Sequence, residues 1–138
     1  MTMLKKQLII TQTDHDKLVD LIKTDETSWF EDALQKKIIL DKLATAKIIP
    51  NSDFPRDIAG LYSTITLRDT IARINHTYTL VPPNEIDGKS DRISVFSPFG
   101  FELLGKGLGS SFTWILKTKR KYYLVADLTR SNSETYAY

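Results

Sequence analysis

The sequence contains no cysteine, and its 138 residues include only two histidines and two methionines. Without cysteine the chain can form no disulfide and offers no thiolate to a metal ion. The two histidines, His15 and His76, fall in different halves of the chain and lack the HExxH spacing of a zinc site. We therefore expect no metal site and no cofactor. No apolar run approaches eighteen residues, so we also expect no membrane span.

The chain also lacks a strong excess of either charge. It has 19 basic and 17 acidic residues, a formal net charge of +2. This balance argues against a dedicated DNA- or RNA-binding module and predicts no direct sequence-specific nucleic-acid recognition. The densest basic block, Lys117 to Lys121 (KTKRK), is expected to be a solvated turn between two strands. The apolar run from Leu8 to Ile10 is far short of a signal-peptide core, so we expect a cytoplasmic protein.

Residues 1–50 predict a short N-terminal antiparallel helical hairpin with a strand-like lead-in over residues 7–12 (QLIITQ). A capping-box pattern at Thr13 and Asp16 predicts a first helix that ends near Lys23. A second capping box at Ser28 and Glu31 predicts a helix that runs to Pro50. Its expected apolar stripe comprises Phe30, Leu34, Ile38, Leu43 and Ala46.

The composition changes at residues 51–60, where proline, asparagine and aspartate indicate a connector. Residues 61–130 then alternate with period two and predict an antiparallel β-domain with one short helix, which begins at Pro98 and ends at Gly105. Residues 131–138 are expected to be a flexible tail. The predicted fold class is α+β. The five segments expected to form strands are YSTITLRD, RINHTYTLV, RISVF, SFTWIL and YYLVADL.

The expected hairpin tip carries four carboxylates and two large rings, and these are candidate functional residues. Paired carboxylates can hold a divalent cation, but solvation of the turn and a favourable interaction with the second helix N-terminus explain them more simply. Of the two rings, one is expected to pack onto the first helix and the other to be an exposed contact residue. The tip residues are Asp25, Glu26, Trp29, Glu31 and Asp32, with Phe30 as the second ring. Further along, GKGLGSS lacks the spacing of a phosphate-binding loop, so its glycines predict tight turns instead.

One longer segment is much more specific than these short patterns. ISVFSPFGFELLGKGLG, residues 93–109, resembles the C-terminal signature of the bacterial Gre-family transcript-cleavage factors, I-S-V-x-S-P followed by four variable residues and L-[IL]-G-K-x-x-G. All ten fixed positions are filled. The preceding segment, TLVPPNEIDGKSDR, resembles the same family. The layout of the whole chain is similar to the Rnk-type relatives of Gre factors (regulator of nucleoside diphosphate kinase), in which a short helical hairpin precedes this domain.

The resemblance implies an FKBP-like β-domain that docks near the secondary channel of bacterial RNA polymerase core. It assigns Ser97, Pro98, Phe99 and Gly100 to the polymerase contact, although Ser97 and Pro98 also suit the start of a helix. We expect a monomer. Two departures from the family stand out: Ser110 replaces the usual aspartate, and KTKRK replaces a Pro-Gly turn.

Three functions follow from these observations. The preferred one is a non-enzymatic, Rnk-like transcription accessory protein that modulates elongation or competes with Gre factors, because a first helix of roughly ten residues is too short to carry the tip acids far. The second is a Gre-type cleavage-stimulating factor that uses those acids at the polymerase magnesium. The third, disfavoured, is a peptidyl-prolyl isomerase. Its pocket needs convergent aromatic rings, whereas alternation places Tyr122 and Tyr123 on opposite faces.

Overall fold

The N-terminal part of the chain is a β–α–α–β unit. The computed structural model describes residues 7–24, 29–88 and 91–130. Strand β1 (Ile9–Thr11) leads into helix α1 (Gln12–Lys23), and helix α2 (Ala33–Ala44) leads into strand β2 (Lys47–Ile49). The two strands pair in parallel, with Ile10 opposite Ile48. Strand β2 was predicted to be helical. Instead the helix ends at Thr45. Residues 47–49 then form backbone hydrogen bonds with β1, which is far away in the sequence.

Both helices begin at different residues from those predicted. The Thr11 hydroxyl, not that of Thr13, caps α1 by accepting a hydrogen bond from the Asp14 amide at 3.2 Å. The Asp32 carboxylate caps α2 by accepting from the Gln35 amide at 2.8 Å. Helix α2 therefore starts after the Ser28–Glu31 segment. Both caps lie in extended backbone immediately before the first helical turn, as an N-cap requires.

The apolar stripe of α2 is also corrected by the structure. Ile39 and Leu43 are the helix residues that are buried, whereas Leu34 and Ile38 are 65% and 41% exposed. Helix α1 meets α2 through a polar contact as well, since the Nε2 atom of His15 lies 2.9 Å from the Leu43 carbonyl oxygen. His15 is thus partly buried between the helices.

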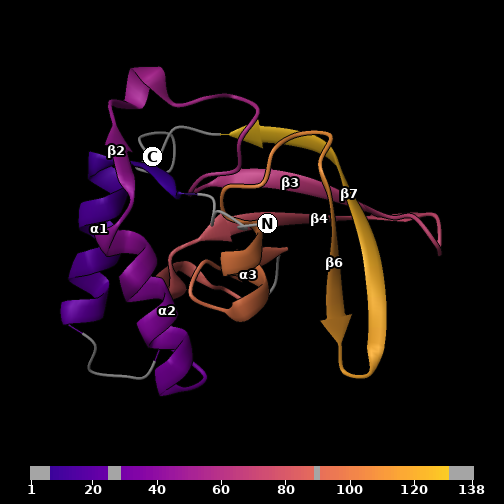
Figure 1. Ribbon diagram of the computed structural model, residues 1–138, viewed down its shortest axis with the longest axis horizontal. Helices are drawn as coiled ribbons and strands as arrows, with labels where there is room; N and C mark the ends of the chain where they lie inside the picture. Colours follow the sequence, from indigo (N-terminus) through magenta and orange to yellow (C-terminus); the bar gives the residue numbers. More distant parts are fainter. Residues whose placement is uncertain (1–6, 25–28, 89–90, 131–138) are drawn as a thin grey trace, which may run out of the picture.

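The C-terminal part is a curled five-stranded sheet that wraps around one short helix (Figure 1). The strand order is β5-β4-β3-β7-β6, and every neighbouring pair is antiparallel except β4 and β5, which are parallel. The prediction of a wholly antiparallel sheet is therefore wrong at that edge. Single 3₁₀ turns at Asn51–Asp53 and Pro83–Glu85 lie in the connector and after β4. The elements are β3 (Ser63–Asp69), β4 (Ile74–Val81), β5 (Arg92–Ser94), α3 (Pro98–Leu103), β6 (Ser111–Leu116) and β7 (Lys119–Arg130).

The period-two pattern places alternate residues on the two faces of the sheet. Ile65 and Leu67 are fully buried on the face that covers α3, while Thr64 and Thr66 lie on the outer face. The last two strands also differ from the prediction. The turn between them comprises Lys117 and Thr118 alone, and the rest of KTKRK begins β7.

The hairpin packs against one end of the β-domain instead of projecting away from it (Figure 1). A buried ion pair joins Asp14 of α1 to Arg130 of β7 at 3.1 Å. The Lys17 ammonium donates to the Tyr62 hydroxyl at 3.0 Å. Buried side chains of both parts form one hydrophobic cluster. No helix within the described ranges is long and apolar enough to cross a membrane.

Candidate functional site

The corner between β5 and α3 is held by the side chain of Ser97. Its hydroxyl accepts a hydrogen bond from the Gly100 amide at 3.1 Å and donates one to the Ser94 carbonyl oxygen at 2.7 Å. Pro98 occupies the first helical turn, where a backbone N–H has no partner within the helix. Its missing N–H therefore costs no helical hydrogen bond. Both Ser97 and Pro98 are half-buried. Two of the four predicted contact residues therefore also build the corner.

Gly100 is buried, and the space beside it excludes any larger residue. A Cβ atom at this position would lie 1.9 Å from the Ser94 carbonyl oxygen and 2.9 Å from the Ser97 hydroxyl oxygen. Glycine is required here because the backbone of α3 approaches the end of β5 directly. Gly100 thus sets the geometry of the corner and presents no side chain to a partner.

Phe99 points into a group of aromatic rings between α3 and the sheet. Its ring centroid lies 5.5 Å from that of Tyr78, 5.2 Å from Trp114 and 6.0 Å from Tyr123. Burial raises the pKa of the Tyr78 and Tyr123 hydroxyls above the ordinary value, since the phenolate loses hydration there. The rings of Tyr78, Phe99, Trp114 and Tyr123 pack against one another and fill the space between α3 and the sheet. Tyr122, by contrast, is 44% exposed, which confirms the predicted alternation.

The glycines that follow α3 form the turns predicted from the sequence. Gly105 and Gly109 have φ angles of 89° and 85°, a region that favours glycine. The Lys106 ammonium pairs with the Glu102 carboxylate at 3.0 Å and lies 4.7 Å from the centre of the Phe112 ring. Lys106 therefore packs against its own domain, and the segment has no phosphate-loop geometry.

The hairpin tip lies next to the corner. Phe30 is buried and stacks on Phe96, the residue before Ser97, with ring centroids 4.9 Å apart. The side-chain amide nitrogen of Gln35, Nε2, donates to the Phe96 carbonyl oxygen at 3.4 Å. The structure thus brings together two regions that the sequence predicted separately. Phe96 itself was missed as a site residue, although it stands within the apolar run of the signature.

The remaining tip residues have different roles. Asp32 caps α2, and Glu31 is exposed. Trp29 is half-buried, and its indole nitrogen is buried without a hydrogen-bond acceptor among the described residues. Asp25 and Glu26 lie outside the described residues. Within the part of the chain that the structure describes, no three histidine, aspartate or glutamate side chains gather in a way that could hold a metal ion.

Comparisons with known proteins agree with the signature at the corner. The sequence profile of the family described as transcription elongation factor, GreA/GreB, C-term matches residues 55–130. A transcription elongation factor GreA from Chloroherpeton thalassium is 39% identical over 67 residues, which is 49% of this chain and 42% of that protein. GreA from Rhodopseudomonas palustris strain TIE-1 is 35% identical over 86 residues, which is 62% of this chain and 54% of that protein.

Among solved structures, the chain is similar to the prokaryotic transcription elongation factor GreA/GreB from Nitrosomonas europaea. The TM-score is 0.77 at 23% identity, over 91% of this chain and 99% of that one, so the likeness extends to the hairpin as a shared fold. The chain spans about half the length of the GreA proteins that it matches. Since the matched region contains the corner, the aromatic group and the whole five-stranded sheet, the chain belongs to the GreA/GreB family of transcription elongation factors.

Proposed function

We propose that this protein binds bacterial RNA polymerase core near the secondary channel and modulates transcription without strongly stimulating transcript cleavage, as expected for a Rnk-like member of the family. The polymerase contact is assigned to the corner at Ser97 and Pro98, together with the adjoining hairpin tip. In this proposal the protein has no catalytic activity of its own. It acts by occupying a surface that longer-armed Gre factors would also use.

The packing of the hairpin tip is the observation that carries this proposal. Helices α1 and α2 have 12 residues each, so each is about 18 Å long. Phe30 holds the tip against the β-domain by stacking on Phe96. The Asp32 carboxylate is already engaged as the cap of α2. A short, docked hairpin of this kind favours binding over delivery of acidic groups to a distant metal centre.

A binding titration against purified bacterial RNA polymerase core tests the proposal. The labelled protein should bind saturably, and an unlabelled Gre factor should displace it. A charge-neutral control substitution on the outer sheet face, Thr66→Ser, should leave the affinity unchanged. Absence of binding at micromolar polymerase would show that the proposal is wrong.

The second candidate function is cleavage stimulation, and the names of the GreA relatives favour it. It requires the tip carboxylates, of which Glu31 and Asp32 lie in the described part of the chain. Asp32→Asn removes the charge but keeps a good N-cap, so it separates loss of acid chemistry from loss of the helix. If stalled complexes are cleaved rapidly with the wild type and slowly with Asp32→Asn or Glu31→Gln, the second function replaces the first.

A further inference from the structure

A groove of about 630 Å³ runs between α2 and the edge strand β6, with α3 at its base. It is open to solvent along one side, so it differs from a closed ligand cavity, and its walls combine apolar and polar groups. Ile38, predicted to be buried, is instead 41% exposed at this groove. The residues that carry the argument are Ile38 and Lys42 from α2, Pro98 and Phe101 from α3, and Ser111 and Trp114 from β6.

Strand β6 is the outermost strand of the sheet on this side. Within the described ranges it pairs with β7 alone, so its other edge offers backbone N–H and C=O groups along six residues. Trp114 faces the groove, while Ile115 and Leu116 are 59% and 52% exposed toward the end of the strand. A free edge beside an apolar groove suits the addition of an extended segment, whose alternate side chains would enter the groove.

The charge around this edge is predominantly positive, although the whole chain carries only +2. The charged residues that line the groove are Lys42, Lys106 and Glu102, and the last two form an ion pair at 3.0 Å. Lys37 lies on the same helix as Lys42 but outside the groove lining, and it pairs with Asp41 at 3.5 Å.

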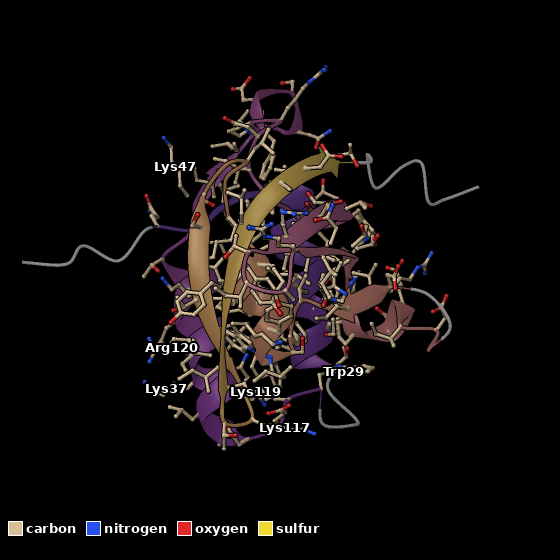
Figure 2. The ribbon with its side chains drawn as sticks, turned by 90° about the vertical axis from the view of Figure 1, so that its right-hand side faces the viewer. Trp29, Lys37, Lys47, Lys117, Lys119 and Arg120 are labelled. Atoms are coloured by element: carbon tan, nitrogen blue, oxygen red, sulfur yellow. The ribbon has the colours of Figure 1, made fainter. Side chains whose placement is uncertain are left out.

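More cations follow directly where β6 ends and β7 begins. The side chains of Lys117, Lys119 and Arg120 are exposed, and Figure 2 shows them at the same end of the molecule as Lys37. An acidic segment on β6 would therefore meet cations along the groove and at the far end of the strand.

We propose that the groove binds an extended, acidic segment of a partner protein, which joins the sheet as a strand beside β6. Backbone hydrogen bonds to β6 fix its direction. Its apolar side chains pack between Ile38 and Trp114, and its carboxylates face Lys42 at one end and Lys119 at the other. This site adjoins the proposed polymerase contact at Pro98 but does not depend on it.

The observations favour this occupant over two others. Single-stranded RNA needs exposed ring faces for base stacking, whereas the Trp114 ring packs against Phe99 with centroids 5.2 Å apart. A second copy of this chain would bring the same cations into the shared edge, where like charges repel. An acidic peptide satisfies both the backbone edge and the surrounding charge.

The test is an NMR titration of the full ¹⁵N-labelled chain with a synthetic peptide of about ten residues that alternates valine with glutamate and ends in two consecutive glutamates on each side, so that carboxylates lie on both faces of the strand at its ends. Saturable shifts and slowed amide hydrogen exchange are expected at Ser111–Leu116. Two control peptides should bind much more weakly. In one, lysine replaces every glutamate, and in the other, proline at alternate positions prevents backbone pairing.

Charge-reversed variants make the test specific. Lys42→Glu with Lys119→Glu should weaken binding about tenfold, while the matched pair Arg56→Glu with Arg68→Glu, outside the groove, should not. Circular dichroism verifies that both double variants remain folded. No shifts at millimolar peptide, equal binding of the lysine peptide, or equal weakening by both double variants would overturn the proposal. Shifts that instead follow protein concentration, or that only an oligoribonucleotide produces, would overturn it in favour of a second copy or of RNA.

Discussion

Replacing Arg130 with methionine tests whether a buried ion pair holds the hairpin on the β-domain. Asp14 and Arg130 are 116 residues apart in sequence, yet their side chains meet at 3.1 Å and are only 3% and 14% exposed. Methionine has a similar length but no charge, so the substitution leaves the Asp14 carboxylate buried without its cation. Removal of one partner from a buried pair costs about 3–5 kcal/mol. We expect a loss of about 3 kcal/mol in the free energy of unfolding at neutral pH, since some solvent reaches the guanidinium.

The loss should depend on pH in a defined direction. Burial raises the pKa of Asp14 above its ordinary value of 3.8, while Arg130 and Thr11 act to lower it. A carboxyl group with a raised folded-state pKa favours folding below its unfolded pKa, and this contribution is lost as the pH rises through the folded pKa. Without Arg130 the folded pKa rises further. The variant should therefore stay close to the wild type near pH 4 and fall progressively behind it toward pH 7.

Urea denaturation followed by far-UV circular dichroism at both pH values measures this difference. The double variant Asp14→Asn with Arg130→Met is the control, because a neutral amide no longer needs the cation. It should recover part of the stability lost by Arg130→Met alone at neutral pH. The Arg130 guanidinium also lies 4.2 Å from the centroid of the Phe54 ring. Loss of this cation–π contact explains the part of the destabilisation that remains at low pH. A neutral-pH loss under about 1 kcal/mol, or the same loss at both pH values, would refute the role of the ion pair.

Three further substitutions test the corner and its contact with the hairpin, each by urea denaturation. Gly100→Ala should cost about 3 kcal/mol or more, because the new methyl group meets a main-chain oxygen at 1.9 Å, whereas Gly107→Ala, with its nearest atom at 3.6 Å, should cost under about 1 kcal/mol. Equal losses for the two would contradict the geometry. Ser97→Ala should cost about 1 kcal/mol through loss of the cap, and Ser97→Thr should retain most of it. Phe30→Ala should cost about 3 kcal/mol by removing the ring stacked on Phe96, and a loss typical of an exposed residue would show that the tip is not docked.

The sequence predicted best the features that depend on neighbouring residues. Helix α3 begins at Pro98 with Ser97 as its cap, since a proline in the first turn and a hydroxyl before it act within one turn of backbone. The buried face of β3 followed from strict alternation through Ile65 and Leu67. Gly105 takes the positive φ angle expected at the end of a helix.

Features that depend on distant partners could not be predicted in the same way. Strand β2 is only three residues long, and its pairing with β1 crosses the whole hairpin. Around the tip, Ser28 and Asp32 are both good cap residues, and local pattern alone could not choose between them. Ile38 fitted the apolar stripe of α2, yet the face that meets the domain is set by Ile39 and Leu43. The pairing of β1 with β2 and the burial of Ile39 and Leu43 both depend on residues that are far apart in the sequence.

The signature residues mainly build the corner, and this bears on where partners can bind. Val95 and Leu103 are 1% and 0% exposed, and Gly100 lies against the backbone of the preceding strand. Such residues preserve a shape, so specificity must come from side chains that are exposed around it. Pro98 is half-buried, belongs to the corner and also lines the groove beside β6. A polymerase surface at the corner and an acidic strand on β6 would therefore meet at Pro98, and a bound acidic peptide should weaken polymerase binding if both contacts are as proposed. Undiminished polymerase binding at saturating peptide would mean that the polymerase contacts the hairpin-tip side of the corner alone.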